Sequence, residues 1–226
     1  MISAIIVAAG KGIRMGPNVD KLFLKLDGRP VVAHTWQIFD EARFIDELII
    51  VVREGSQTSF QRLAEEYKFS KRFQLISGGA ERQDSVWNGL QALSPEAHIV
   101  VIQDAARPCT SPQLIAATIT AASEMGAAVA AQPVTDTIKE SVDGQLVGRT
   151  LDRSRLWAVQ TPQTFRVEII RRALAEVRKK GLVVTDDTAA CELIGQPVKL
   201  VLGTQPNPKV TRPEDIAYVE LLLARV

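Results

Sequence analysis

The sequence predicts an α/β fold: a Rossmann-like, mostly parallel sheet with helices on both faces, plus a protruding β-arm. Two observations favour it. Short apolar runs of strand length alternate with helix-like segments along most of the chain, which is the order of βα units. The apolar runs are continuous, as expected for strands of a parallel sheet that is covered on both faces.

Each element follows from its local pattern. Helices are predicted where apolar residues recur with helical spacing, as Phe60, Leu63 and Tyr67 do. The turn Asp27-Gly28 precedes Pro30, a residue suited to the first turn of a helix. The predicted strands cover residues 2–9, 47–52, 73–76, 99–102, 127–132 and 198–202, and the helices cover residues 31–42, 59–67, 84–93, 113–126, 165–180, a segment from 186, and 213–225.

One segment departs from the alternation. Residues 137–142 and 145–151 look like two polar strands joined by Asp143-Gly144, a dipeptide typical of hairpins. An isolated two-stranded hairpin is marginally stable in water, so a partner surface is expected. We therefore expect one domain over residues 1–226, with an arm at about 136–155 that forms a homodimer.

Composition excludes several classes of protein. The 226 residues are 46% apolar and carry a net charge of +1, so the basic excess of a nucleic-acid-binding protein is absent. No apolar run reaches the ~18 residues of a membrane span. Cys109 and Cys191 lie far apart without metal-ligand spacing, and are interpreted as small buried hydrophobes. The N-terminus shows no secretory pattern, so a cytoplasmic location is expected.

A glycine-rich loop follows the first predicted strand. It runs from Gly10 to Gly16 and contains Lys11 and Arg14. Glycine lets backbone N–H groups approach a ligand closely, and the cations favour an anion, most plausibly a phosphate. The dinucleotide fingerprint fails because Met15 stands where it needs glycine, and the P-loop spacing fails as well. A plain βα turn is the structural alternative.

Two further segments carry candidate chemistry. Gly78-Gly79 leads through residues 80–85 into a predicted helix, whose free N–H groups accept anions, although ordinary helix capping explains the pattern equally well. Asp104 follows an apolar strand, and ligands of open α/β sheets bind at that edge. A lone carboxylate there suits Mg²⁺ together with substrate phosphates. The alternative is an ion pair between Asp104 and Arg107 alone.

Six motifs in order carry a family resemblance. They are AAGKGIRM, GGAERQDSV, DAARP, LDRSRLWAVQTPQ, TDDTAACE and PNPKVTRPED, and they span almost the whole chain. With them the chain resembles the 2-C-methyl-D-erythritol 4-phosphate cytidylyltransferase family of polyol-phosphate nucleotidyltransferases. The resemblance implies transfer of CMP from CTP to the 4-phosphate of methylerythritol, release of pyrophosphate, and Mg²⁺ as cofactor, within nonmevalonate isoprenoid synthesis.

The resemblance also implies roles for individual residues. CTP would be held by Ala8, Ala9, Gly10, Gly12, Gly79, Ala80, Ser85 and Ala105. The polyol-phosphate side would be lined by Asp104, Arg107, Thr137, Thr161 and Thr185, with Asp104 also holding Mg²⁺. The catalytic cations would be Arg14, Lys21, Arg153 and Lys209, of which Arg14 and Lys21 would stabilise the transition state. Arg153 and Lys209 would orient the acceptor, Arg153 from the partner subunit's arm.

The sequence departs from the family pattern at two places. Asp20-Lys21-Leu22 replaces the usual P-K-Q, and Ala80 stands where a polar or acidic residue is frequent. Two rival functions stay open: a ribitol-5-phosphate cytidylyltransferase, whose acceptor is also a polyol phosphate, and an inactive nucleotide-binding homologue. His34 and His98 lie outside every motif and are interpreted as structural.

Overall fold

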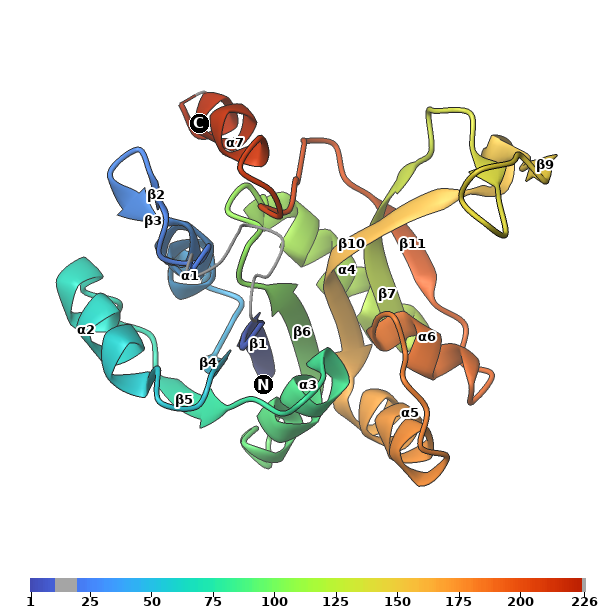
Figure 1. The fold of residues 1–226 in the computed structure, drawn as a ribbon. Coiled ribbons are helices and arrows are strands. Elements are labelled where there is room, and N and C mark those ends of the chain that lie inside the picture. The colour runs from blue at the N-terminus through green and yellow to red at the C-terminus, as the bar shows by residue number, and fades with distance from the viewer. Residues whose placement is uncertain (11–19, 225–226) are drawn as a thin grey trace.

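The protein is built on a seven-stranded central sheet. The computed structural model describes residues 1–10 and 20–224, and within them the strand order is β11-β7-β10-β6-β1-β4-β5. Figure 1 shows this sheet between two groups of helices. The strands of the sheet are β1 (Ile2–Ala8), β4 (Glu47–Val52), β5 (Phe73–Ser77), β6 (Ile99–Asp104), β7 (Ala127–Pro133), β10 (Trp157–Arg166) and β11 (Lys199–Leu202).

Helices cover both faces, which confirms the predicted fold class. The helices are α1 (Val31–Glu41), α2 (Gln57–Tyr67), α3 (Arg82–Gln91), α4 (Pro112–Met125), α5 (Val167–Lys179), α6 (Asp187–Glu192) and α7 (Asp215–Leu223). One core cluster joins the sheet to α1, α2, α4 and α7, and a second joins it to α3, α5 and α6. Every residue of β4 and β6 is buried, as the continuous apolar runs predicted.

Strand β10 was missing from the prediction. It runs antiparallel between β6 and β7, whereas β6, β1, β4 and β5 are parallel neighbours. Residues 160–163 were interpreted as lying outside regular elements, and Phe165 as the start of a helix. Both interpretations are wrong: β10 pairs through its backbone with β6 and β7, with a register shift between Val159 and Gln163, although its sequence is not an apolar run. Helix α5 begins at Val167.

Smaller corrections concern element ends near the sheet edge. Helix α3 starts at Arg82, two residues earlier than predicted, because Glu81 and Asp84 form a reciprocal capping box. Strand β6 continues through Asp104, so this residue ends the strand rather than following it. Pro30 precedes α1 as its N-cap, after a short hairpin of β2 (Lys25–Leu26) and β3 (Arg29–Pro30).

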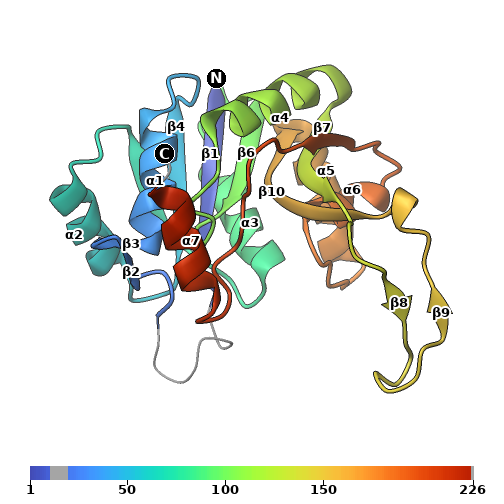
Figure 2. The same ribbon diagram turned by 90° about the horizontal axis from the view of Figure 1, so that it is seen from above.

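The arm is less regular than predicted. Strands β8 (Lys139–Glu140) and β9 (Arg149–Thr150) pair over two residues each. Asp143 and Gly144 do not form a two-residue hairpin. Instead the Asp143 carboxylate accepts the backbone N–H groups of Gln145 and Leu146 and holds a wider loop. Figure 2 shows this arm, together with the 3₁₀ turn η2 (Arg153–Arg155), extending away from the sheet.

Within the described part of the chain, no helix is long and apolar enough to cross a membrane.

Candidate active site

A cavity lies at the carboxyl ends of β1 and β6. These strands are parallel neighbours in which Val7 pairs with Asp104, so the chain segments that follow them meet at one edge of the sheet. The cavity encloses about 260 Å³. Of the predicted site residues it is lined by Ala8, Ala9, Gly10, Lys21, Gly79, Ala80, Ser85, Asp104, Ala105 and Lys209.

The second glycine loop forms one wall of this first cavity. A Cβ on Gly79 would lie 2.3 Å from Asp84 Cβ, and one on Gly78 would lie 2.4 Å from Ala9 Cβ. Only glycine therefore fits where the chain turns into α3. The backbone N–H of Gly79 donates to Ser85 Oγ at 3.1 Å. The capping interpretation is correct, and the capped loop also lines the cavity.

Asp104 lies at the centre of three cations. Its Oδ2 accepts from Lys209 Nζ at 2.8 Å and lies 3.5 Å from Arg107 Nε, while its Oδ1 lies 3.5 Å from Arg82 Nε. The alternative of a pair with Arg107 alone is therefore wrong. Burial favours the neutral acid, but Lys209, Arg82 and Arg107 together hold the pKa of Asp104 well below its usual range. The group is a carboxylate at neutral pH.

A second cavity of about 500 Å³ adjoins the first. Arg82, Asp104 and Lys209 line both. The second cavity adds the predicted residues Arg107, Thr161 and Thr185, so a ligand in either cavity would face the same charged cluster. The Arg107 guanidinium is anchored by donating from Nη1 to the backbone oxygen of Asn207 at 2.6 Å. Thr161 Oγ1 accepts the backbone N–H of Asp104 at 3.1 Å.

Lys21 lines the first cavity. Its Nζ donates to the backbone oxygen of Val210 at 3.0 Å. The preceding Asp20, which replaces the proline of the family pattern, pairs with Arg53 after β4 and accepts the backbone N–H of Leu22. An ion pair and a turn thus fix the entry to the Lys21 segment where a proline ring would have stiffened it.

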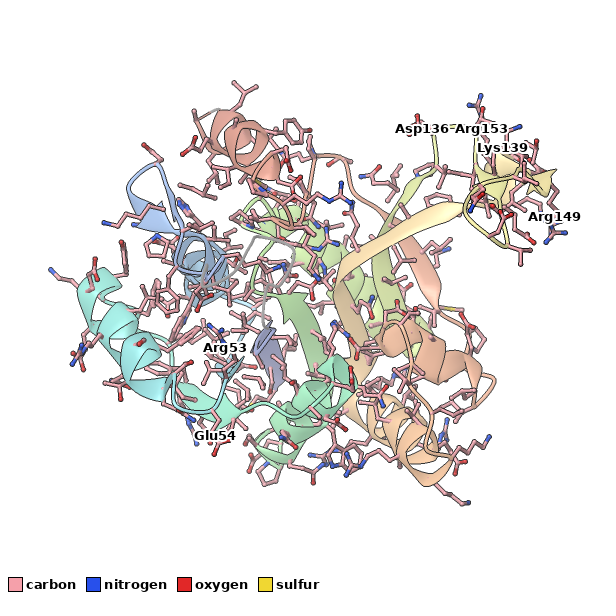
Figure 3. All side chains as sticks on the ribbon, viewed as in Figure 1. Arg53, Glu54, Asp136, Lys139, Arg149 and Arg153 are labelled. Carbon is pink, nitrogen blue, oxygen red and sulfur yellow. The ribbon has the colours of Figure 1, made fainter. Side chains whose placement is uncertain are left out.

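Two predicted residues lie away from both cavities. Thr137 and Arg153 belong to the arm, and Figure 3 shows Arg153 far out from the sheet, on the same arm as Lys139 and Arg149. Arg153 Nη1 donates to the backbone oxygen of Thr135 at 2.6 Å. Within one chain these residues are not brought to the site. The predictions for Gly12 and Arg14 fall outside the described residues.

Sequence reasoning missed Arg82 and its partner Asp187. Arg82 Nη1 donates to Asp187 Oδ2 at 2.7 Å, and the Asp187 side chain is 1% exposed. Burial alone would lower the pKa of Arg82, but Asp187 and Asp104 raise it, so the guanidinium stays charged. The available signal was its position in the glycine loop at a helix N-terminus. His34 and His98 line neither cavity.

The fold and the site together define an α/β nucleotidyltransferase. Small and glycine residues at the carboxyl edge of the sheet line adjoining cavities of about 260 and 500 Å³, beside lysine and arginine side chains. These groups can position and neutralise phosphates without a protein nucleophile.

Comparison with known proteins specifies the family. The profile described as "IspD: 2-C-methyl-D-erythritol 4-phosphate cytidylyltransferase" matches residues 2–225, and the chain belongs to this family. The enzyme of that name from Alkaliphilus oremlandii is 44% identical over 98% of this chain and 94% of its own length. The one from Pelotomaculum thermopropionicum is 43% identical with the same coverage.

Solved structures agree with the family assignment. The crystal structure of 4-diphosphocytidyl-2C-methyl-D-erythritol synthase from Anaerococcus prevotii superposes with a TM-score of 0.88 at 32% identity, covering 100% of this chain and 96% of its own. That of the Thermus thermophilus cytidylyltransferase gives 0.80 at 34% identity and covers both chains fully. The chain is thus a cytidylyltransferase of isoprenoid biosynthesis, and ribitol 5-phosphate is not the favoured acceptor.

Proposed function

We propose that the chain binds CTP in the first cavity, called the nucleotide-side cavity from here on, and the phosphate of 2-C-methyl-D-erythritol 4-phosphate in the second, the acceptor cavity. The two substrates would react at the charged cluster of Arg82, Asp104 and Lys209 between them. The observation that carries this placement is that Asp104, Arg82 and Lys209 line both cavities. Two anionic substrates that must react with each other need positive charge at their meeting point.

CTP binding relies on backbone groups and small side chains. Ala8 ends β1 and is followed by Ala9 and Gly10, and Gly79 and Ala80 precede α3. Their backbone N–H groups can approach phosphates or the base edge without a large side chain in the way. Ser85 holds the turn through its hydroxyl, which accepts from Gly79 and donates to the backbone oxygen of Glu81 at 3.3 Å. Ala105 completes the lining after β6.

The reaction is an in-line displacement at the α-phosphorus of CTP. An oxygen of the acceptor 4-phosphate attacks, the bond from the α-phosphorus to the β-phosphate bridging oxygen breaks, and pyrophosphate leaves with that electron pair. No protein nucleophile is required. Lys21 and Lys209 oppose the negative charge that spreads over the phosphoryl oxygens, and Arg107 and Thr161 hold the acceptor.

Asp104 is the proposed ligand of Mg²⁺. Among the described residues, no group of three His, Cys, Asp or Glu side chains could hold a metal by itself. One carboxylate nevertheless fits Mg²⁺ as it binds nucleotides, with phosphate oxygens and waters completing the shell. Bound there, the cation would neutralise triphosphate charge. Activity of Asp104→Asn that equals wild type at limiting Mg²⁺ would contradict this role.

The arm suggests that the site is completed by a second subunit. Val142, Leu146 and Val147 on the arm are 99%, 74% and 64% exposed, and such apolar side chains are better accommodated on a partner surface. We propose a homodimer in which Arg153 and Thr137 reach the partner's acceptor cavity.

A mixing experiment tests this arrangement. Arg153→Ala and Lys209→Ala homodimers should each be nearly inactive. If each site takes Arg153 from one chain and Lys209 from the other, subunit exchange should restore up to about a quarter of wild-type activity. No recovery after demonstrated exchange, or a fully active monomer at micromolar concentration, would refute the shared site.

The activity itself is tested with purified protein, CTP and Mg²⁺. Pyrophosphate release should require methylerythritol phosphate and be far slower with ribitol 5-phosphate. Equal rates with both acceptors would make ribitol-5-phosphate cytidylyltransferase an equally good assignment. No pyrophosphate release with either acceptor would favour an inactive nucleotide-binding homologue.

A further inference from the structure

Arg82 connects three elements around the two cavities. It begins α3, and its guanidinium contacts Asp187 at the start of α6 and Asp104 at the end of β6, at 2.7 Å and 3.5 Å. It also lines both cavities. No other side chain in the described residues pairs with both of these carboxylates.

The contacts of Arg82 belong to a closed ring. From Asp187 the ring continues through its backbone N–H, which donates to Gln163 Oε1 at 3.1 Å. Gln163 lies on β10 two residues after Thr161, and Thr161 Oγ1 accepts the backbone N–H of Asp104 at 3.1 Å. Arg82 closes the ring between Asp187 and Asp104. Within this ring, Arg82 is therefore one of two links between Asp104, which lines both cavities, and the chain segments around the second cavity; the other is the bond to Thr161.

Part of this arrangement is structural. Asp187 is fully buried, and burial raises its pKa while the Arg82 guanidinium opposes that change. Nη1 of Arg82 supplies the positive charge that the buried Asp187 carboxylate requires. Its Nε, however, faces Asp104, whose other oxygen holds Lys209 at 2.8 Å. Neutralising Asp187 does not require that second contact.

We propose that Arg82 is a positioning residue for CMP transfer: it fixes the direction of the Asp104 carboxylate and the start of α6, and so keeps the acceptor cavity aligned with the nucleotide-side cavity. The proposal rests on the placement of CTP and acceptor given above. Without the Nε contact the carboxylate can rotate, and Lys209 moves with it. In-line transfer is sensitive to such shifts, since a displacement of about 1 Å can reduce the rate by on the order of 10².

A double-variant comparison separates positioning from packing. Arg82→Gln alone leaves Asp187 buried without its cation and should lower stability. Arg82→Gln combined with Asp187→Asn removes both charges, so its urea midpoint should return toward that of wild type. If Arg82 positions Asp104, kcat of the double variant should still be reduced by roughly 10- to 100-fold, with KM for CTP changed by less than about threefold.

Two single variants complete the set. Asp187→Asn retains the contact of Arg82 with Asp104 and should keep kcat within about threefold of wild type. Arg178→Gln is the control, because Arg178 also pairs with a carboxylate, Asp84 on α3, at 3.2 Å, but is 47% exposed and lines neither cavity. It should leave kcat unchanged.

The outcomes are distinct. A double variant that recovers both stability and kcat shows a purely structural Arg82 and overturns the proposal. Lys209→Gln, assayed in parallel, tests the placement of the substrates separately. Wild-type kinetics of Lys209→Gln would overturn that placement, whereas an impaired Lys209→Gln beside a fully active double variant would overturn the role of Arg82 alone.

Discussion

Replacing Asp104 by asparagine should destabilise the fold as well as impair catalysis. The change is nearly isosteric but removes the one negative charge that Lys209 contacts at 2.8 Å and that Arg82 and Arg107 approach at 3.5 Å. Removing one partner of a buried ion pair costs about 3–5 kcal/mol, because the other charge stays buried without compensation.

The size of the stability loss in Asp104→Asn depends on how exposed the cations around Asp104 are. Arg107 is 10% exposed and cannot be rehydrated, but Lys209 is 34% exposed and can turn toward water. We therefore expect the lower end of the range, a loss of about 3 kcal/mol in the free energy of unfolding at pH 7. In urea denaturation this corresponds to a midpoint lower by at least about 1 M. Asp84→Asn is the control: its side chain is 30% exposed, pairs with Arg178 and accepts the backbone N–H of Glu81 in the α3 capping box. The asparagine oxygen can still accept that N–H, so a loss below about 1 kcal/mol is expected.

The effect has a defined pH dependence. The pKa of Asp104 is lowered in the folded protein, so its stabilisation is complete above the unfolded pKa of about 3.9 and is lost as the pH falls toward the folded value. The difference between wild type and Asp104→Asn should be constant from about pH 5 to 8 and shrink only below about pH 4. A destabilisation under about 1 kcal/mol at pH 7, or one that disappears already at pH 6, would refute the reasoning.

Further predictions concern other residues. Lys21→Ala should reduce kcat by on the order of 10²–10³ with little change in KM for CTP, and a raised KM at normal kcat would reassign Lys21 to ground-state binding. Burial raises the pKa of Cys109 to about 11 and that of Cys191 to about 12. Iodoacetamide at pH 8 should therefore modify both thiols on the order of 100-fold more slowly than after unfolding in urea, and equal rates would contradict this. Burial also lowers the pKa of His34, so the stabilisation from its neutral form is complete above about pH 6.5 and falls at lower pH. In His34→Gln the free energy of unfolding, measured by urea denaturation, should therefore depend less on pH between about pH 5 and 7.

Short sequence patterns identified much of the lining of the first cavity. The glycine pair before α3 and the carboxylate after an apolar run were identified because each depends on a few neighbouring residues. Asp104, Gly79 and Lys21 do line one cavity. Their placement follows from a general rule, since the carboxyl ends of neighbouring parallel strands share one edge.

Other parts of the site left no local signal. Strand β10 carries Thr161 and Gln163 as buried polar residues, and a polar stretch with a proline does not look like a central strand. It is a strand through backbone pairing with β6 and β7, and its polar side chains accept the backbone N–H groups of Asp104 and Asp187, which are distant in sequence. For Arg153 the sequence motif was clear, but within a single chain the residue lies on the arm and away from both cavities.

The sequence by itself therefore determined the fold class and the family, and it supplied most of the residues proposed to bind the substrates. Periodicity, glycine positions and ordered motifs can be read from the sequence alone, because they depend on the order of residues along the chain and not on the fold. The tertiary structure alone decided that β10 runs antiparallel in the middle of the sheet and that Arg82 links Asp104 to Asp187. Contacts between Arg82 and Asp187 span 105 positions in sequence, and only the packing of α3 and α6 around one sheet edge brings such charges into contact and makes their burial tolerable.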